Sequence, residues 1–226
     1  MISVDPHCVF VHIPKTGGTS VAVAFLSRHG LTYDERAPLL MRPRVDESEG
    51  PPRLAHLTAR GYVDHGHLST EQWNAMFSFT FVRNPWSRAY SLYLVTNQNR
   101  NESFEEFVLT RLERLMRGES AWFVQPQCDF LECSPDAKPI DFVGRFETLA
   151  MDFAALADRL GISPDLPHEN PSRAYGREAT ADKDARIADR YTDAMIEEIA
   201  VLYRRDVDSF GYRFADLYAR ADQQLR

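Results

Sequence analysis

A nine-residue segment near the N-terminus carries the densest set of groups that could bind an anion. It runs from His12 to Ser20 and reads HIPKTGGTS. Gly17 and Gly18 let backbone N–H groups turn toward a ligand, and Lys15 adds a full positive charge. Hydroxyl donors come from Thr16, Thr19 and Ser20. This combination predicts a phosphate-binding loop. The alternative is an ordinary strand–turn–helix with a solvated lysine.

The segments on either side of this loop favour that prediction. Cys8–Ile13 is a short apolar run typical of a buried strand in a parallel sheet. After the glycines, Thr19 or Ser20 could cap a helix that ends near Gly30. The positive end of the helix dipole would then face the anion. The loop is not a Walker A motif, because Lys15 precedes the glycines instead of following them.

A second group of candidate anion ligands follows another predicted strand, Phe77–Val82. Arg83 comes at the end of this strand, and Pro85 suits the first turn of a helix that carries Ser91. An arginine fork with a hydroxyl suits a phosphate. Arg88 could join these two residues or pair with an acidic side chain. The alternative for Arg83 is a structural role at the end of the strand.

Two histidines precede the second block and are candidates for proton transfer. Residues 61–68 could contain a short strand that ends in His65-Gly66-His67. Histidine suits general base catalysis at neutral pH. In a strand the two imidazoles would face the same side, so metal binding is an alternative. No third ligand is evident nearby, and we expect no metal.

The alternation of predicted strands and helices along the chain predicts an α/β fold. We expect a P-loop-like three-layer domain with a central, mostly parallel sheet flanked by helices. We expect residues 1–226 to form a single domain. Residues 36–60 are rich in proline and mixed charges, which favours an irregular segment. The other predicted elements are a short helix after a capping box at Ser69, a helix from Ser103 to about Met116, a strand at Ile140–Gly144, and helices at Leu149–Leu160 and Asp193–Phe210.

Composition narrows the possible partners and the compartment. The net charge of −7 argues against non-specific nucleic-acid binding. The three cysteines do not suggest a disulfide framework, although Cys128 and Cys133 could pair. We see neither a transmembrane run nor a signal peptide, so we expect a cytoplasmic location.

The two anion-binding blocks together resemble a known family. His12–Ser20 resembles the 5′-phosphosulfate loop of carbohydrate sulfotransferases, including the heparan sulfate 2-O-sulfotransferase branch. The resemblance implies that the co-substrate is 3′-phosphoadenosine-5′-phosphosulfate (PAPS), with Lys15 at the bridging oxygen that leaves. Arg83 and Ser91 match the 3′-phosphate motif of the family. His67 matches its general base, with His65 as the second candidate. The 5′ end would be held by Lys15, Thr16, Gly17, Gly18, Thr19 and Ser20.

The expected reaction is sulfuryl transfer from PAPS to a hydroxyl of a carbohydrate or glycolipid, which releases adenosine 3′,5′-bisphosphate. One alternative is a P-loop kinase that uses ATP and magnesium on a small molecule. Another is a non-catalytic nucleotide-binding protein of the same fold. Ser172 and Arg173, in a loop before the last helices, are weaker candidates for the 3′-phosphate end.

Overall fold

The computed structural model describes residues 1–97, 101–167 and 187–218. They form two compact units, each built from two stretches of the chain. The first unit comprises Met1–Val82 and Asp129–Asn170, and the second comprises Arg83–Cys128 and Pro171–Arg226. The described helices include none with both the length and the apolar character needed to cross a bilayer.

The first unit is built around a four-stranded sheet in the order β1-β2-β3-β4. β1 runs antiparallel to β2, whereas β2, β3 and β4 are parallel to one another. The register places Phe10 opposite Phe79, and Phe79 opposite Phe142. The expected mostly parallel sheet is therefore confirmed. The strands are Ile2–Val4, His7–Val11, Phe77–Val82 and Phe142–Arg145.

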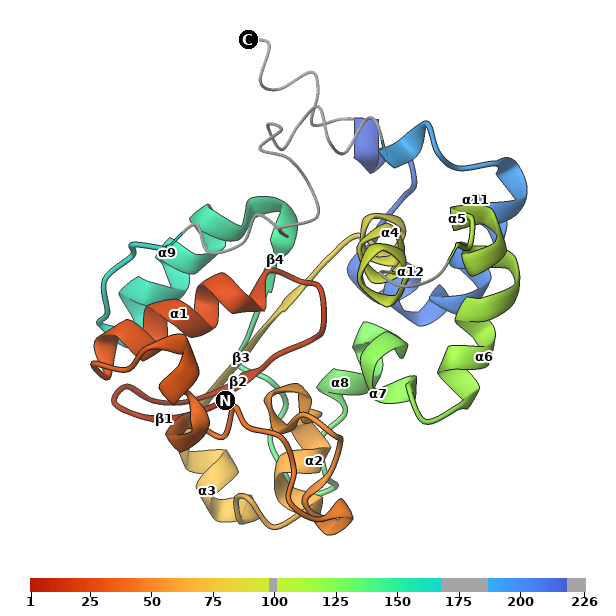
Figure 1. Ribbon diagram of the computed structural model, residues 1–226. Coiled ribbons are helices and arrows are strands. Elements are labelled where there is room, and N and C mark those ends of the chain that lie inside the picture. Colours follow the sequence, from red (N-terminus) through yellow and green to blue (C-terminus); the bar gives the residue numbers. More distant parts are fainter. Residues whose placement is uncertain (98–100, 168–186, 219–226) are drawn as a thin grey trace, which may run out of the picture. The chain divides into compact units, whose positions relative to one another are not determined.

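Helices cover both faces of this sheet and give the expected three layers. Figure 1 shows α1 (Gly18–Arg28) and α9 (Leu149–Leu160) on one side of the strands, and α2 (Ala59–Asp64) and α3 (Thr70–Ala75) on the other. Alternate strand residues point toward α1 and α9 because successive side chains of a strand face opposite sides. The resulting core contains Phe10, Phe25, Phe79, Phe81 and Phe153, all fully buried.

Several local predictions in this unit are confirmed. β3 spans the predicted residues, and α9 ends at Gly161, whose φ of +64° is the left-handed conformation that stops a helix. The capping box at Ser69 is present, with Gln72 as its partner. The strand predicted for residues 61–68 is wrong. Thr58 caps α2 there by accepting the Gly61 N–H at 2.9 Å.

Residues 36–60 are largely irregular, as expected, but they are ordered by short turns. Four 3₁₀ turns lie in or beside this segment, at Tyr33–Glu35, Ala37–Leu39, Glu47–Glu49 and Leu54–His56. Residues 42 to 54, termed the 42–54 loop here, are closed at their base by backbone hydrogen bonds. The Arg44 N–H donates to Pro52 O at 3.2 Å, and the Leu54 N–H donates to Arg42 O at 3.0 Å.

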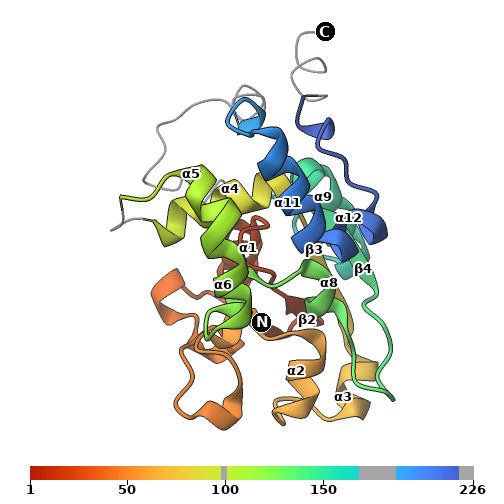
Figure 2. The same cartoon turned by 90° about the vertical axis from the view of Figure 1, so that its right-hand side faces the viewer.

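The second unit is helical (Figure 2). Its first part contains α4 (Pro85–Thr96), α5 (Phe104–Glu106), a π-helical stretch, Phe107–Arg111, then α6 (Leu112–Arg117) and α7 (Ala121–Val124). α8 (Gln127–Leu131) leads back to the first unit, and α11 (Asp193–Leu202) and α12 (Arg204–Phe210) follow later in the chain. The helix predicted after Ser103 is thus present, with a π turn inside it.

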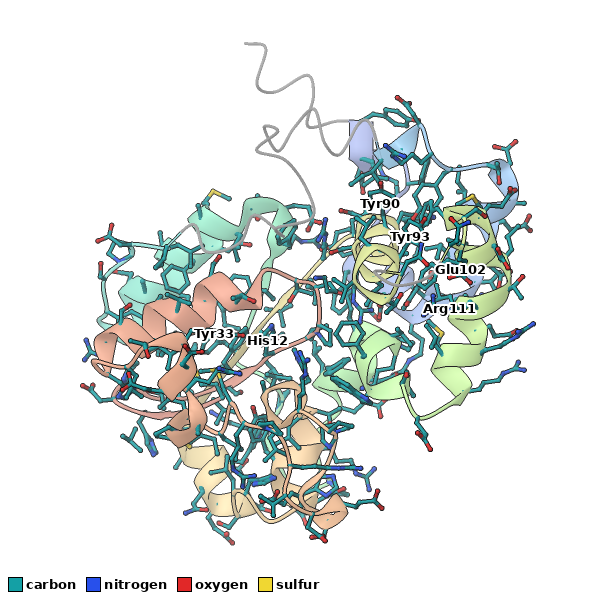
Figure 3. All side chains as sticks on the ribbon, viewed as in Figure 1. His12, Tyr33, Tyr90, Tyr93, Glu102 and Arg111 are labelled. Atoms are coloured by element: carbon teal, nitrogen blue, oxygen red, sulfur yellow. The ribbon has the colours of Figure 1, made fainter. Side chains whose placement is uncertain are left out.

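The single helix predicted for residues 193–210 is wrong, because it breaks at Tyr203 into α11 and α12. The Tyr203 hydroxyl donates to the carbonyl oxygen of Val124 at 2.7 Å, which anchors the break in the interior. Elsewhere in this unit, Glu102 and Arg111 form an ion pair at 2.6 Å beside the aromatic rings of Tyr90 and Tyr93 (Figure 3).

Candidate functional site

The loop between β2 and α1 has an unusual backbone. Lys15 has a φ of +71°, which is uncommon for a residue with a side chain, and Gly17 has a φ of +84°. The Thr16 hydroxyl is buried and donates to Ile13 O at 2.9 Å. The Thr16 side chain therefore closes the loop. The lysine is held in a strained backbone conformation of the kind often found at ligand-binding sites.

The N-terminus of α1 lacks a side-chain cap. Gly17 occupies the capping position, so the capping residue expected at Thr19 or Ser20 is wrong. The helix begins earlier because Gly17 adopts the left-handed conformation without a steric penalty. The first turn contains no acidic residue. N–H groups at such a helix start attract anions, and this one carries Lys15 two residues before the cap.

Both glycines of the loop are also required by packing. A Cβ on Gly18 would lie 2.1 Å from Cδ2 and 2.2 Å from Nε2 of His12. A Cβ on Gly17 would lie 2.8 Å from Leu149 and 2.9 Å from Phe146, on α9 and just before it. The glycine pair therefore lets the start of α1 press against neighbouring side chains. In a phosphate-binding loop, glycine also allows a close approach of the backbone to a ligand.

His12 and His56 form a pair of rings behind the loop. Their centroids lie 4.5 Å apart, and His56 Nδ1 donates to the backbone oxygen of His12 at 2.8 Å. His12, labelled in Figure 3, also stacks on Phe10 at 5.1 Å. Removal from water lowers the pKa of His12 well below its usual value and that of His56 to about 4. Both rings are therefore neutral at physiological pH, and Lys15 supplies the charge of the loop.

The second predicted anion block begins directly after β3, in the second unit. Arg83 donates from Nε at 2.9 Å and from Nη2 at 2.6 Å to the Ser87 hydroxyl oxygen. Ser91 lies one helical turn beyond Ser87 on α4, so the two hydroxyls share a helix face. The sequence interpretation paired Arg83 with Ser91 and missed Ser87. The spacing of four residues between these positions is the signal that could have identified it.

The backbone of Arg83 is held from both sides by a buried glutamine. Arg83 N–H donates to Gln127 Oε1 at 2.8 Å, and Gln127 Nε2 donates to Arg83 O at 2.8 Å. The fully buried Asp206 carboxylate accepts the N–H groups of Gln127 and Cys128 at 2.8 and 2.9 Å. Arg83 is thus fixed at the start of the segment that leads into α4.

The Arg88 side chain is bound by a backbone carbonyl group of the helical unit. It is 1% exposed, and Nη1 donates to the backbone oxygen of Gln125 at 3.0 Å. Its guanidinium also lies 5.6 Å from the centre of the Tyr203 ring. The neighbouring Asn84 caps α4 by accepting the Trp86 N–H at 3.1 Å. These contacts give Arg88 a structural role within the helical unit.

His65 and His67 lie in the turn after α2. His65 Nδ1 lies 2.8 Å from Ser48 O, and His67 Nε2 lies 2.7 Å from Glu49 O. The segment is a helix end and not a strand, so the strand geometry that the metal alternative assumed for these two histidines is absent. Within the described residues, no group of three His, Cys, Asp or Glu side chains could hold a metal. Both histidines lie in the same unit as the β2–α1 loop.

Cys8, Cys128 and Cys133 are free thiols, so the pairing left open by the sequence is absent. Burial raises the pKa of Cys8 to about 12. Ser172 and Arg173 lie outside the described residues.

Comparison with known proteins adds one match. A family profile described as the sulfotransferase family matches residues 1–213, which is most of the chain and includes both predicted anion-binding blocks. A search of curated proteins and a search of solved structures each gave no significant match. The profile spans the α/β sheet, the β2–α1 loop and the helical unit. The chain therefore belongs to the sulfotransferase family.

Proposed function

We propose that the protein transfers a sulfuryl group from PAPS to a hydroxyl of an acceptor and releases adenosine 3′,5′-bisphosphate. The observation that carries the proposal is the uncapped N-terminus of α1, with Lys15 held at positive φ beside it. A helix N-terminus and a lysine suit the phosphosulfate end of such a donor. Membership of the sulfotransferase family supports sulfuryl transfer as the reaction.

The donor fits the chemistry of the two predicted blocks. We assign the 5′-phosphosulfate to Lys15 and to the backbone and hydroxyl groups of residues 16–20. We assign the 3′-phosphate to Arg83 and Ser91, with Ser87 added because it already accepts from the Arg83 guanidinium. An arginine fork flanked by hydroxyls is a common phosphate ligand set.

The proposed reaction moves one bond and one proton. The acceptor oxygen forms a bond to sulfur while the bond between sulfur and the bridging phosphate oxygen breaks. By analogy with phosphoryl transfer, charge develops on the leaving oxygen, and the Lys15 ammonium would stabilise it. An alcohol is a weak nucleophile at neutral pH, so His67 would take the proton of the acceptor hydroxyl. No metal ion is part of the proposal.

We propose a carbohydrate or glycolipid without acidic groups as the acceptor. The net charge of the chain is −7, which disfavours a densely sulfated polymer. In the 42–54 loop, Arg42 pairs with Glu49 and Arg44 pairs with Glu47 at 3.0 Å. These arginines are therefore neutralised within the loop and do not form a basic surface for an anionic sugar.

Calorimetry with adenosine 3′,5′-bisphosphate and with ATP, each with and without magnesium, tests the donor. We expect magnesium-independent binding of the bisphosphate, weakened at least tenfold in Lys15→Ala and in Arg83→Ala, since each loses a charged hydrogen bond of about 1.5–3 kcal/mol. A preference for ATP with magnesium would overturn the proposal in favour of a kinase. Binding of the bisphosphate without transfer from PAPS to any hydroxyl in a sugar and glycolipid panel would indicate a non-catalytic nucleotide-binding protein.

A further inference from the structure

The 42–54 loop contacts both histidines of the turn after α2 through two consecutive carbonyl groups. Ser48 O lies 2.8 Å from His65 Nδ1, and Glu49 O lies 2.7 Å from His67 Nε2. A carbonyl oxygen only accepts hydrogen bonds, so the histidine nitrogen in each contact carries the proton. His65 is exposed and His67 is half-buried. The contact therefore fixes the orientation and the tautomer of the more enclosed ring.

The Glu49 side chain holds its own carbonyl group in place. Its carboxylate accepts two hydrogen bonds from Arg42, the longer at 3.0 Å, and one from the Val45 N–H at 2.6 Å. Hydrogen bonds from Arg42 and then from Val45 lower the pKa of Glu49 to about 2, so the carboxylate is ionised at any working pH. The turn continues into Gly50, whose φ of +120° favours glycine.

We propose that the Arg42–Glu49 pair positions His67 for catalysis by fixing it as the Nε2–H tautomer. This inference rests on the proposed role of His67 as the general base. With Nε2 protonated and bound to Glu49 O, the lone pair is on Nδ1. The proton of the acceptor hydroxyl then passes to Nδ1 as the acceptor oxygen bonds to sulfur. The ring becomes a cation whose Nε2–H still donates to the carbonyl oxygen of Glu49.

The contact between His67 and the carbonyl of Glu49 resembles the contact between a catalytic histidine and the group that orients it. In such sites one ring nitrogen exchanges the proton, while a hydrogen bond at the other nitrogen sets the tautomer and stabilises the cation. Here a backbone carbonyl takes the place of a carboxylate, and the ion pair of Arg42 with Glu49 keeps it there. The 42–54 loop thereby acquires a role in proton transfer that is separate from any contact with the acceptor.

The test compares Glu49→Gln with Glu47→Gln. Both remove one carboxylate from the same turn and break one arginine pair, but only Glu49 presents its carbonyl to His67. In Glu49→Gln, an amide NH₂ faces Arg42 or the Val45 N–H, which are donors themselves, so the turn loosens. We expect kcat to fall about tenfold, part of the 10²–10⁴ that a positioned base contributes, with an unchanged KM for PAPS. Glu47→Gln should keep the wild-type kcat.

Histidine side-chain 1H–15N spectra at about pH 8, where a free imidazole is neutral, report the tautomer without any turnover. We expect His67 as the Nε2–H form in the wild type and in Glu47→Gln, and a mixture of tautomers in Glu49→Gln. A wild-type Nδ1–H form, or equal kcat values in the two variants alongside an active wild type, would overturn the inference. Full turnover in His67→Ala would refute the proposed role of His67 as the base. The spectra would still show whether the contact with Glu49 fixes the tautomer of the ring.

Discussion

Substitution of Gly18 by alanine should destabilise the protein, although it replaces a glycine in a helix. By propensity alone the change would stabilise α1 by up to about 1 kcal/mol. The new methyl group, however, would lie 2.1–2.2 Å from the His12 ring, far inside contact distance. Overpacking of this kind costs about 1–3 kcal/mol. We therefore expect a net loss of about 1–2 kcal/mol in the free energy of unfolding, measured by urea titration.

The double variant provides the matched control. In a His12→Ala background the ring is absent, so Gly18→Ala should be neutral or stabilising by up to about 1 kcal/mol. The coupling between the two changes should thus reach about 1–3 kcal/mol. Calorimetry with adenosine 3′,5′-bisphosphate should show weaker binding to Gly18→Ala than to the wild type. If Gly18→Ala had the same effect in both backgrounds to within about 0.5 kcal/mol, the packing argument would be refuted.

Three other changes follow from the same contacts. Ser87→Ala should weaken bisphosphate binding by about 2- to 10-fold through the loss of one partner of Arg83, and unchanged calorimetric affinity would contradict this. Gln127→Leu should lower the free energy of unfolding by about 2–4 kcal/mol, because it leaves the buried Asp206 with fewer donors; a urea midpoint like the wild type would refute it. Burial lowers the pKa of His56 from 6.5 in the unfolded chain to about 4 in the folded protein. The free energy of unfolding should therefore fall by on the order of 3 kcal/mol as the pH drops from 6.5 to 4. In His56→Gln, urea titrations over this pH range should show a smaller fall, and an unchanged fall would contradict the argument.

Much of the sheet and of its flanking helices follows from local sequence patterns. The apolar run at Phe77–Val82 and the amphipathic stretch at Leu149–Leu160 match β3 and α9 residue for residue. Tyr62 and Val63 favour a strand by local propensity, but residues 59–64 form α2. Tertiary contacts override this preference. The Tyr62 side chain is buried, and its hydroxyl donates at 3.1 Å to the carbonyl oxygen of Phe10, which is distant in the sequence.

Charged residues and glycines of the candidate site could be predicted from the sequence. Contacts made by backbone atoms could not. Lys15, Gly17 and Gly18 stand out by type and spacing, and the structure adds the reason for each glycine. The contact of His67 with the carbonyl of Glu49 has no sequence signal, since every residue has a carbonyl. The pairing of His56 with His12 joins residues 44 positions apart, and only the tertiary fold brings them together.

The hydrogen bonds between Gln127 and the backbone of Arg83 affect the entropy of ligand binding. Fixing the backbone of one residue costs about 1–2 kcal/mol of conformational entropy at room temperature. Because the two amide hydrogen bonds and the buried Asp206 hold this segment in the folded chain, that loss is incurred when the protein folds and not when a ligand arrives. The guanidinium is also hydrogen-bonded to Ser87 in the folded chain, so a phosphate at Arg83 would have little left to order. Binding at this arginine should therefore carry a small entropic penalty.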